Sequence, residues 1–120
     1  MTSSTRATPT AAATAPTTVA PSYQIIWEFE VNHGQERSFE KTYGKGGPWA
    51  RLLAKGEGHI GTELLICRDQ PGRYLTIDRW ASVTAYETFH RKHAAASAKL
   101  DDECAGLTKR ESRVGQFDLK

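Results

Sequence analysis

The sequence contains only two cysteines, Cys67 and Cys104, which lie far apart and form no Cys-x-x-Cys pair. This scarcity argues against a disulfide-dense scaffold and favours free thiols in a reducing cytoplasm. No apolar run approaches the length of a membrane-spanning helix. The formal net charge is only +2, so the chain lacks the basic footprint of a nucleic-acid-binding protein. We therefore expect neither a membrane nor a nucleic acid as partner.

Residues 1–22 also have very little apolar bulk. Thr, Ala, Ser and Pro dominate this segment, with Arg6 as its one charged residue and no aromatic residue. It lacks the apolar stretch of a secretory signal, and its prolines disfavour an amphipathic targeting helix. Since such a segment buries too little surface to offset the entropy of ordering it, we predict a disordered tail over residues 1–22 and one domain over residues 23–120.

The first strongly patterned segment covers residues 23–31. Apolar side chains alternate with polar ones there, and this period of two predicts a strand with one apolar face. Two helical segments are predicted next. Phe39 and Tyr43 are spaced i,i+4 within residues 35–43, and Pro48 suits the first position of a second helix. The glycines between them lack the ending of a phosphate-binding loop.

Residues 60–67 and 73–80 predict a β-hairpin, because the turn signal Asp-Gln-Pro-Gly lies between them. Residues 64–67 are apolar on both faces, which is typical of a sheet that is covered on both sides. Ser82 is a suitable N-cap for a helical region that we expect to reach about residue 105, with a break near Ala96. Residues 108–119 predict a final strand that lies at an edge or crosses to a partner subunit.

The predicted order of elements is βαββαβ, which is the split βαβ or ferredoxin-like arrangement. We therefore predict an α+β fold with a four-stranded antiparallel sheet and helices on one face. The opposite face carries apolar residues such as Leu75 and Ile77. A second copy of the chain would cover that face most simply, which predicts a homodimer through the open sheet face.

Three short motifs resemble a known family. They are GHIGTELL at residues 58–65, RYLTIDRWAS at residues 73–82 and AYETF at residues 85–89. These motifs resemble the antibiotic biosynthesis monooxygenase family, which is known for dimeric α+β barrels. The shared features are a glycine-flanked strand, a strand that ends in Trp80, the polar cap Ser82 and the Ala–aromatic pair that follows. The resemblance covers residues 23–119. It implies a superfamily that includes cofactor-free oxygenases of polyphenolic polyketides, haem-degrading enzymes and isomerases.

The haem-degrading branch of this superfamily resembles the chain less well. That branch has an Asn where this chain has Trp27, a Trp where it has Phe89, and an axial His beyond the position of His93, where this chain has alanines. We therefore expect no haem. The resemblance to the cofactor-free oxygenases implies a reaction without flavin, haem or metal.

The predicted catalytic residues are Asp78 and His93. Asp78 on a half-buried strand needs a partner. It either pairs with an arginine such as Arg110 or Arg113, or removes a proton from a phenol or an anthrone-like carbon. His93 is either a packed neutral imidazole or a general base. His90 and His93 could also form a metal pair, but no third and fourth ligand accompany them in the sequence.

Aromatic side chains predict a cleft between the sheet and the helices. A flat aromatic wall suits a flat aromatic substrate, although the same side chains can serve as core packing. The predicted substrate-binding residues are Trp27, Phe29, Trp49, Tyr86, Phe89 and His90. The acidic residues 101–103 are interpreted as a solvated helix face.

Two functional hypotheses follow from these residues. The first is a cofactor-free oxygenase that acts on a small aromatic or polyketide-like molecule. The second is a non-catalytic dimeric module that binds a small molecule or serves as a scaffold. The first requires an enclosed pocket with at least two inward polar groups and one perturbed titratable group. Side chains that fill the space between helices and sheet would favour the second.

Overall fold

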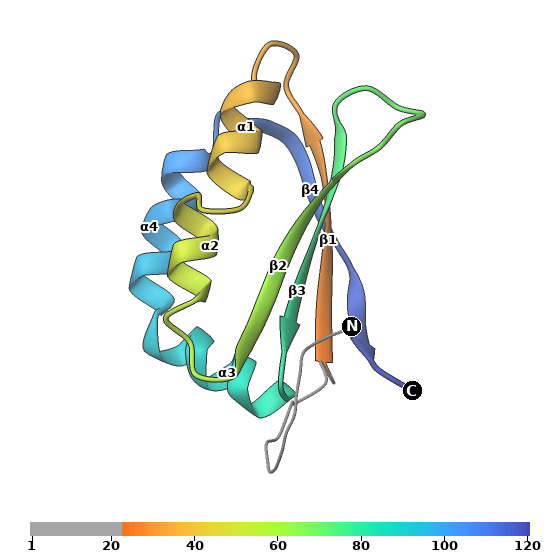
Figure 1. The fold of residues 1–120 in the computed structure, drawn as a ribbon. Coiled ribbons are helices and arrows are strands. Elements are labelled where there is room, and N and C mark those ends of the chain that lie inside the picture. The colour runs from red at the N-terminus through yellow and green to blue at the C-terminus, as the bar shows by residue number, and fades with distance from the viewer. Residues whose placement is uncertain (1–22) are drawn as a thin grey trace.

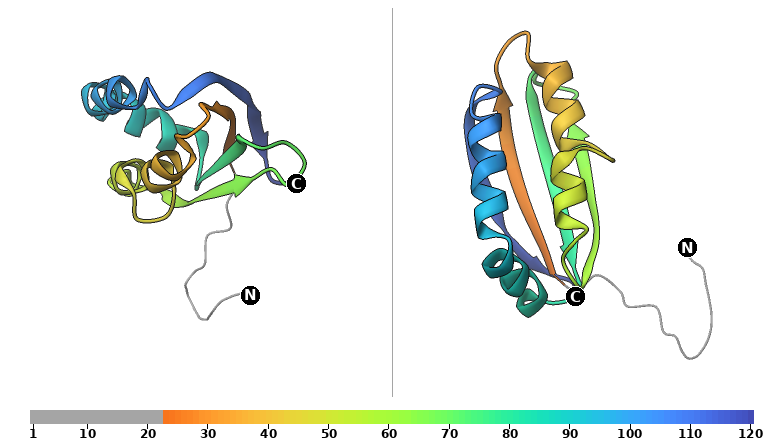
Figure 2. Two further views of the ribbon diagram at one scale, coloured as in Figure 1. Left: turned by 90° about the horizontal axis from the view of Figure 1, so that it is seen from above. Right: turned by 90° about the vertical axis from the view of Figure 1, so that its left-hand side faces the viewer.

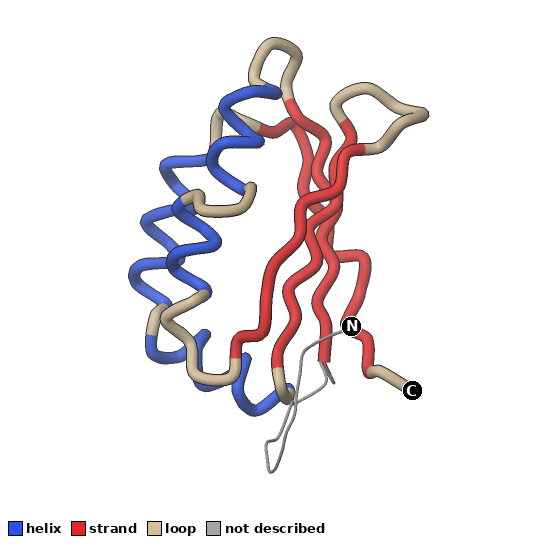
Figure 3. Tube along the Cα trace, in the orientation of Figure 1, coloured by secondary structure: helices blue, strands red, loops and turns tan. Residues whose placement is uncertain are grey.

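The computed structural model describes residues 23–120, so the predicted disordered tail over residues 1–22 lies outside the described residues. The described chain is a sheet with its helices on one face, which Figures 1 and 3 show as two separate layers. The elements are β1 (Tyr23–Val31), α1 (Glu36–Tyr43), α2 (Pro48–Leu53), β2 (His59–Ile66), β3 (Arg73–Trp80), α3 (Val83–Lys92), α4 (Ala94–Cys104) and β4 (Thr108–Asp118). This order confirms the predicted ferredoxin-like α+β fold.

The sheet has the strand order β2-β3-β1-β4, and each neighbouring pair is antiparallel. β1 and β3 are therefore central, while β2 and β4 are the edges, as predicted for β4. The alternation in β1 is confirmed, because its side chains from Tyr23 to Val31 are buried at every second position except at the partly exposed Trp27. Figure 2 shows α1, α2 and α4 in front of the sheet, with α3 at one end.

Local sequence signals set most helix boundaries. Pro48 is the first residue of α2, where its missing N–H costs no helical hydrogen bond. Ser82 caps α3 through its side-chain oxygen, which accepts a hydrogen bond from the Ala85 N–H at 3.1 Å. The predicted break near Ala96 is wrong, since the break falls at His93. His93 has φ −116° and ψ 24°, outside the helical region, and the alanines after it are strong helix formers that begin α4.

The core consists of two clusters of buried side chains. One cluster surrounds Trp80 and Phe89, and the other surrounds Phe39 and Tyr74. Trp80 and Phe39 have no exposed surface at all. Trp27 is partly buried and packs against both clusters. Large indole side chains such as this one therefore mark the boundary between the two halves of the core.

The sheet face opposite the helices carries apolar side chains that this chain does not cover. The strand registers place Leu65 opposite Leu75, and Ile26 opposite Ile77, on that face. Leu65 is 44% exposed and Ile66, at the edge, is 60% exposed. The single chain therefore leaves part of residues 64–67 exposed, and cover on both sides depends on the predicted partner subunit. Among residues 23–120, no helix is long and apolar enough to span a membrane.

Candidate functional site

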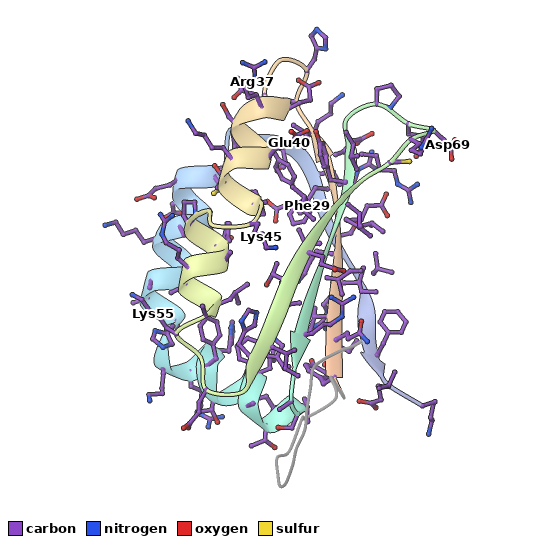
Figure 4. The ribbon with its side chains drawn as sticks, in the orientation of Figure 1. Phe29, Arg37, Glu40, Lys45, Lys55 and Asp69 are labelled. Atoms are coloured by element: carbon purple, nitrogen blue, oxygen red, sulfur yellow. The ribbon has the colours of Figure 1, made fainter. Side chains whose placement is uncertain are left out.

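A partly open cavity of about 200 Å³ lies between the sheet and the helices. All six residues predicted to bind a substrate line this cavity: Trp27, Phe29, Trp49, Tyr86, Phe89 and His90. Figure 4 shows the labelled Phe29 in the space between the helix layer and the sheet. The sequence pattern therefore located the wall of the cavity, although a role in binding stays a prediction.

The cavity lies where the two core clusters meet. Trp27 from β1 and Trp49 from α2 pack against both clusters and also line the cavity. The indole Nε1 of Trp49 is buried and has no hydrogen-bond partner of normal geometry, although it lies close enough to the Tyr43 hydroxyl to affect its pKa. A buried N–H without a good partner is costly, so this donor could serve a ligand oxygen.

The structure places the Asp78 carboxyl group in the cavity wall. Burial raises its pKa from 3.8 to about 6, and a hydrogen bond with Thr62 acts in the opposite direction. The predicted arginine partner is wrong. Asp78 lies on β3, whose neighbours are β1 and β2, whereas Arg110 and Arg113 lie on β4. Asp78 therefore faces Thr62 across the β2–β3 hairpin.

Tyr86 lies beside Asp78 in the cavity wall. Burial raises the pKa of its phenol, while the positive charge of Arg113 lowers it and the carboxylate of Asp78 raises it. The rings of Tyr86 and His90 stack with their centroids 5.8 Å apart. Tyr86 therefore remains a neutral hydroxyl at physiological pH, which can donate a hydrogen bond to a substrate oxygen.

His93 does not line the cavity. It lies at the junction of α3 and α4, half-buried, with its ring centroid 4.9 Å from that of Phe89. The structure therefore brings Asp78 but not His93 to the cavity, and the catalytic role of His93 stays a prediction that its position does not favour.

The chain matches the antibiotic biosynthesis monooxygenase family model over residues 22–99. The protein belongs to this family. No curated protein matches the chain. Among solved structures, the chain is similar to SnoaB, a cofactor-independent oxygenase from Streptomyces nogalater. The two sequences are 21% identical, the match covers 84% of this chain and 95% of that chain, and the TM-score is 0.61.

Two further structures have the same fold. A candidate antibiotic biosynthesis monooxygenase from Bordetella bronchiseptica has 19% identity, 84% and 99% of the two chains covered, and a TM-score of 0.67. PA3566 from Pseudomonas aeruginosa has 14% identity, 87% and 99% covered, and a TM-score of 0.59. Identities this low establish the shared fold alone. The chemistry of this member of the antibiotic biosynthesis monooxygenase family must therefore be argued from its own cavity.

Sequence reasoning missed several polar residues of this family member. Thr62 and Thr76 line the cavity from β2 and β3, and Glu111 lines it from β4. Asp101 also lines it, although residues 101–103 are exposed, as predicted. Its position one helical turn before Cys104, which is buried, was the available signal.

The most informative missed residue of this family member is His59. Its Nε2 lies 3.0 Å from Thr62 Oγ1, and burial lowers its pKa. Its ring meets Trp80 edge-on with the centroids 4.9 Å apart. Within residues 23–120, no three His, Cys, Asp or Glu side chains are grouped closely enough to hold a metal ion.

Proposed function

We propose that the protein is a cofactor-independent oxygenase of a small aromatic molecule, with Asp78 as its general base. The observation that carries this proposal is the position of the Asp78 carboxyl group in the wall of an aromatic cavity, where partial burial raises its pKa to about 6. At neutral pH such a group is mostly ionised, yet it is a stronger base than an ordinary aspartate. Tyr86 beside it can donate a hydrogen bond to the oxygen on which charge develops.

The proposed reaction balances without an added reductant. Asp78 removes a proton from an acidic C–H group of an anthrone-like substrate, or from an O–H group of a hydroquinone-like one, and the electrons of that bond remain on the substrate as a delocalised anion. For an anthrone-like carbon, this anion reduces O₂ and forms a C–O bond. The resulting peroxide takes the proton back from Asp78. Loss of water then breaks the O–O bond and leaves a carbonyl group, so the substrate supplies all the electrons.

The size and charge of the cavity limit the substrate class. Its volume of about 200 Å³ exceeds the ~150 Å³ that holds a benzene ring but falls below the ~300–1,000 Å³ of drug-sized sites. We infer that one or two rings enter it and that a larger molecule would protrude through its open side. Of the residues that the structure describes, Asp78, Asp101 and Glu111 line it and no Lys or Arg does. An uncharged or cationic substrate is therefore favoured over a carboxylate.

A second candidate function is binding without reaction. The cavity is partly open to solvent, whereas oxygen chemistry on a carbanion requires a dry site. A non-catalytic small-molecule-binding module would need the aromatic walls but not the titrating carboxyl group. The two functions therefore differ in what removal of the Asp78 charge does to turnover and to binding.

The test is oxygen uptake by metal-stripped, flavin-free protein against a panel of anthrones and hydroquinones. We expect uptake that rises with pH through about 6, as Asp78 ionises, and that falls by about 10²-fold or more in Asp78→Asn. Glu57→Gln removes an exposed carboxylate outside the cavity and is the matched control. Ligand binding by the parent protein with no uptake from any substrate would favour the binding module and refute the oxygenase.

We also propose a cytoplasmic homodimer that forms through the open sheet face. The exposed Leu65 and the partly buried Leu75 and Ile77 support this assembly, and two free cysteines suit a reducing compartment. Leu65→Glu should convert a dimer to a monomer in light scattering coupled to size exclusion. Lys45→Glu makes an exposed charge change on the helix side and should leave the dimer intact. A parent protein that runs as a monomer at all concentrations would contradict the proposal.

A further inference from the structure

His59, Thr62 and Asp78 form a continuous polar chain from the start of β2 into the cavity. His59 Nε2 lies 3.0 Å from Thr62 Oγ1, and Thr62 is the cross-strand partner of Asp78, where its hydroxyl lowers the pKa of the Asp78 carboxyl. Asp78 and Thr62 line the cavity, whereas His59 does not. His59 would therefore act on a substrate only through Thr62 and Asp78.

A β-bulge makes this chain possible. His59 pairs with Trp80, Gly61 pairs with Arg79 and Thr62 pairs with Asp78, so β2 uses one residue more than β3 over this stretch. In a regular strand, residues three apart face opposite sides of the sheet. The extra residue restores both His59 and Thr62 to the face that carries Trp80 and Asp78.

The hydroxyl group of Thr62 has a single proton, which fixes the direction of each hydrogen bond. When Asp78 is ionised, Thr62 donates to the carboxylate, and His59 must then donate its Nε2–H to Thr62 Oγ1. When Asp78 is protonated, it can donate to Thr62, and Thr62 can donate to His59 Nε2. The chain thus has two complete arrangements, one for each protonation state of Asp78.

We propose that Thr62 and His59 are positioning residues that orient Asp78 and carry its proton between the cavity and the imidazole. This inference rests on the proposed function for its catalytic meaning. In the transfer step, the Asp78 proton moves to Thr62 Oγ1 while the hydroxyl proton of Thr62 moves to His59 Nε2. The products are a carboxylate and an imidazolium, and no electrons change hands. This step holds the substrate proton on His59 while the anion reacts, and its reverse returns the proton to Asp78, which then gives it to the peroxide.

The energetics suit such a transfer. Burial raises the pKa of Asp78 to about 6 and lowers the pKa of His59 from 6.5, so the two groups approach one another in proton affinity. The neighbouring titratable group is Tyr86, whose pKa the Asp78 carboxylate raises and the charge of Arg113 lowers. The exposed His90 lines the same cavity and stacks on Tyr86. None of these groups interrupts the His59–Thr62–Asp78 chain.

The test that does not depend on turnover is an NMR titration of the Asp78 carboxyl carbon. Because the hydrogen bond with Thr62 lowers the pKa of Asp78, Thr62→Val should raise the titration midpoint, and Thr62→Ser should restore it. Thr84→Val, on the exposed surface of α3, is the matched control. An Asp78 midpoint that is the same in the parent and in Thr62→Val would overturn the proposal, even if the oxygenase reaction is real.

The kinetic test uses oxygen uptake by folded variants, with folding checked by thermal unfolding. Thr62→Val should lower kcat by about tenfold or more and Thr62→Ser should recover most of it. His59→Gln keeps an N–H donor for Thr62 but accepts no proton, so it should reduce kcat and remove the His59 ionisation from the pH profile, with little change in KM. His33→Gln, in an exposed turn, controls for loss of an imidazole.

An unchanged pH profile in His59→Gln would refute the transfer. Absence of uptake in the parent, with the NMR shift present, would refute the oxygenase and leave the positioning intact.

Discussion

Replacement of Asp78 by Asn should make the protein more stable at neutral pH while it destroys the proposed base. The isosteric amide keeps the size of the side chain and removes the charge that burial disfavours. The pKa of Asp78 is about 6 in the folded protein, against 3.8 for the unfolded reference. This difference corresponds to about 3 kcal/mol of free energy that the folded state loses when the group ionises.

The sign of the pH dependence follows from proton binding. Between pH 3.8 and about 6 the folded state holds a proton at Asp78 that the unfolded state has released. The contribution of Asp78 to stability is therefore fully present below pH 3.8 and is lost as the pH rises through about 6. Of the total, about 2 kcal/mol should disappear between roughly pH 4.5 and pH 7.5. Asp78→Asn lacks this loss altogether.

The assay is urea unfolding of the parent and Asp78→Asn at several pH values in that interval. We expect the free energy of unfolding of Asp78→Asn, relative to that of the parent, to increase by about 2 kcal/mol from roughly pH 4.5 to pH 7.5. Taking this difference cancels the titration of all other groups. Glu28→Gln provides the opposite case, because the hydrogen bond from Arg73 lowers the pKa of Glu28, so its deficit should shrink as the pH falls below 4.5. A relative stability of Asp78→Asn that is constant or declines with rising pH would refute the reasoning.

Three further predictions concern the framework of the site. Gly58→Ala should destabilise the protein by about 1–3 kcal/mol in urea unfolding, because Gly58 has φ +90° and an added Cβ would lie 2.8 Å from the Ala85 Cβ. Gly61→Ala, where no atom lies within 4 Å of the added Cβ, should cost less than about 0.5 kcal/mol, and an equal cost would contradict the steric argument. Ser82→Ala should cost about 1 kcal/mol through loss of the cap, and its far-UV circular dichroism should show a shortened α3. Phe39→Ala should cost about 3–5 kcal/mol in thermal or urea unfolding, since Phe39 has no exposed surface, and a cost below 1 kcal/mol would show that the core readily collapses around it.

The fold could be predicted because its signals are local. Alternation in residues 23–31, the turn before Arg73 and the cap Ser82 each depend on a few neighbouring residues, and all three are present in the structure. The break between the last two helices was misplaced because alanines after His93 give no signal of where a helix interrupts. Helix propensity there is high on both sides of the break, so the choice depends on tertiary packing.

The walls of the site could be predicted better than its polar groups. Large aromatic residues on the apolar face of β1 and on the helices must meet between the two layers, so Trp27, Phe29 and Phe89 were identified from their spacing. Asp78 was found because a carboxylate on a half-buried strand is unusual. Its partner was not found, because the sequence gives no direct indication that β3 is separated from β4 by β1. Strand order is a property of the whole sheet and not of any one segment.

The position of the predicted catalytic histidine was equally hard to foresee. The sequence analysis selected His93 because it shares a helical period with aromatic residues, and it did not consider His59. A regular strand would place His59 and Thr62 on opposite faces of the sheet. The bulge at residues 59–61 reverses that expectation and turns Thr62 toward Asp78. Bulges are frequent beside active sites because they redirect a side chain without disturbing the rest of the sheet. The one departure from regular pairing between β2 and β3 thus lies where His59 and Thr62 meet. This irregularity supports the proposal that the His59–Thr62–Asp78 chain has a role beyond packing.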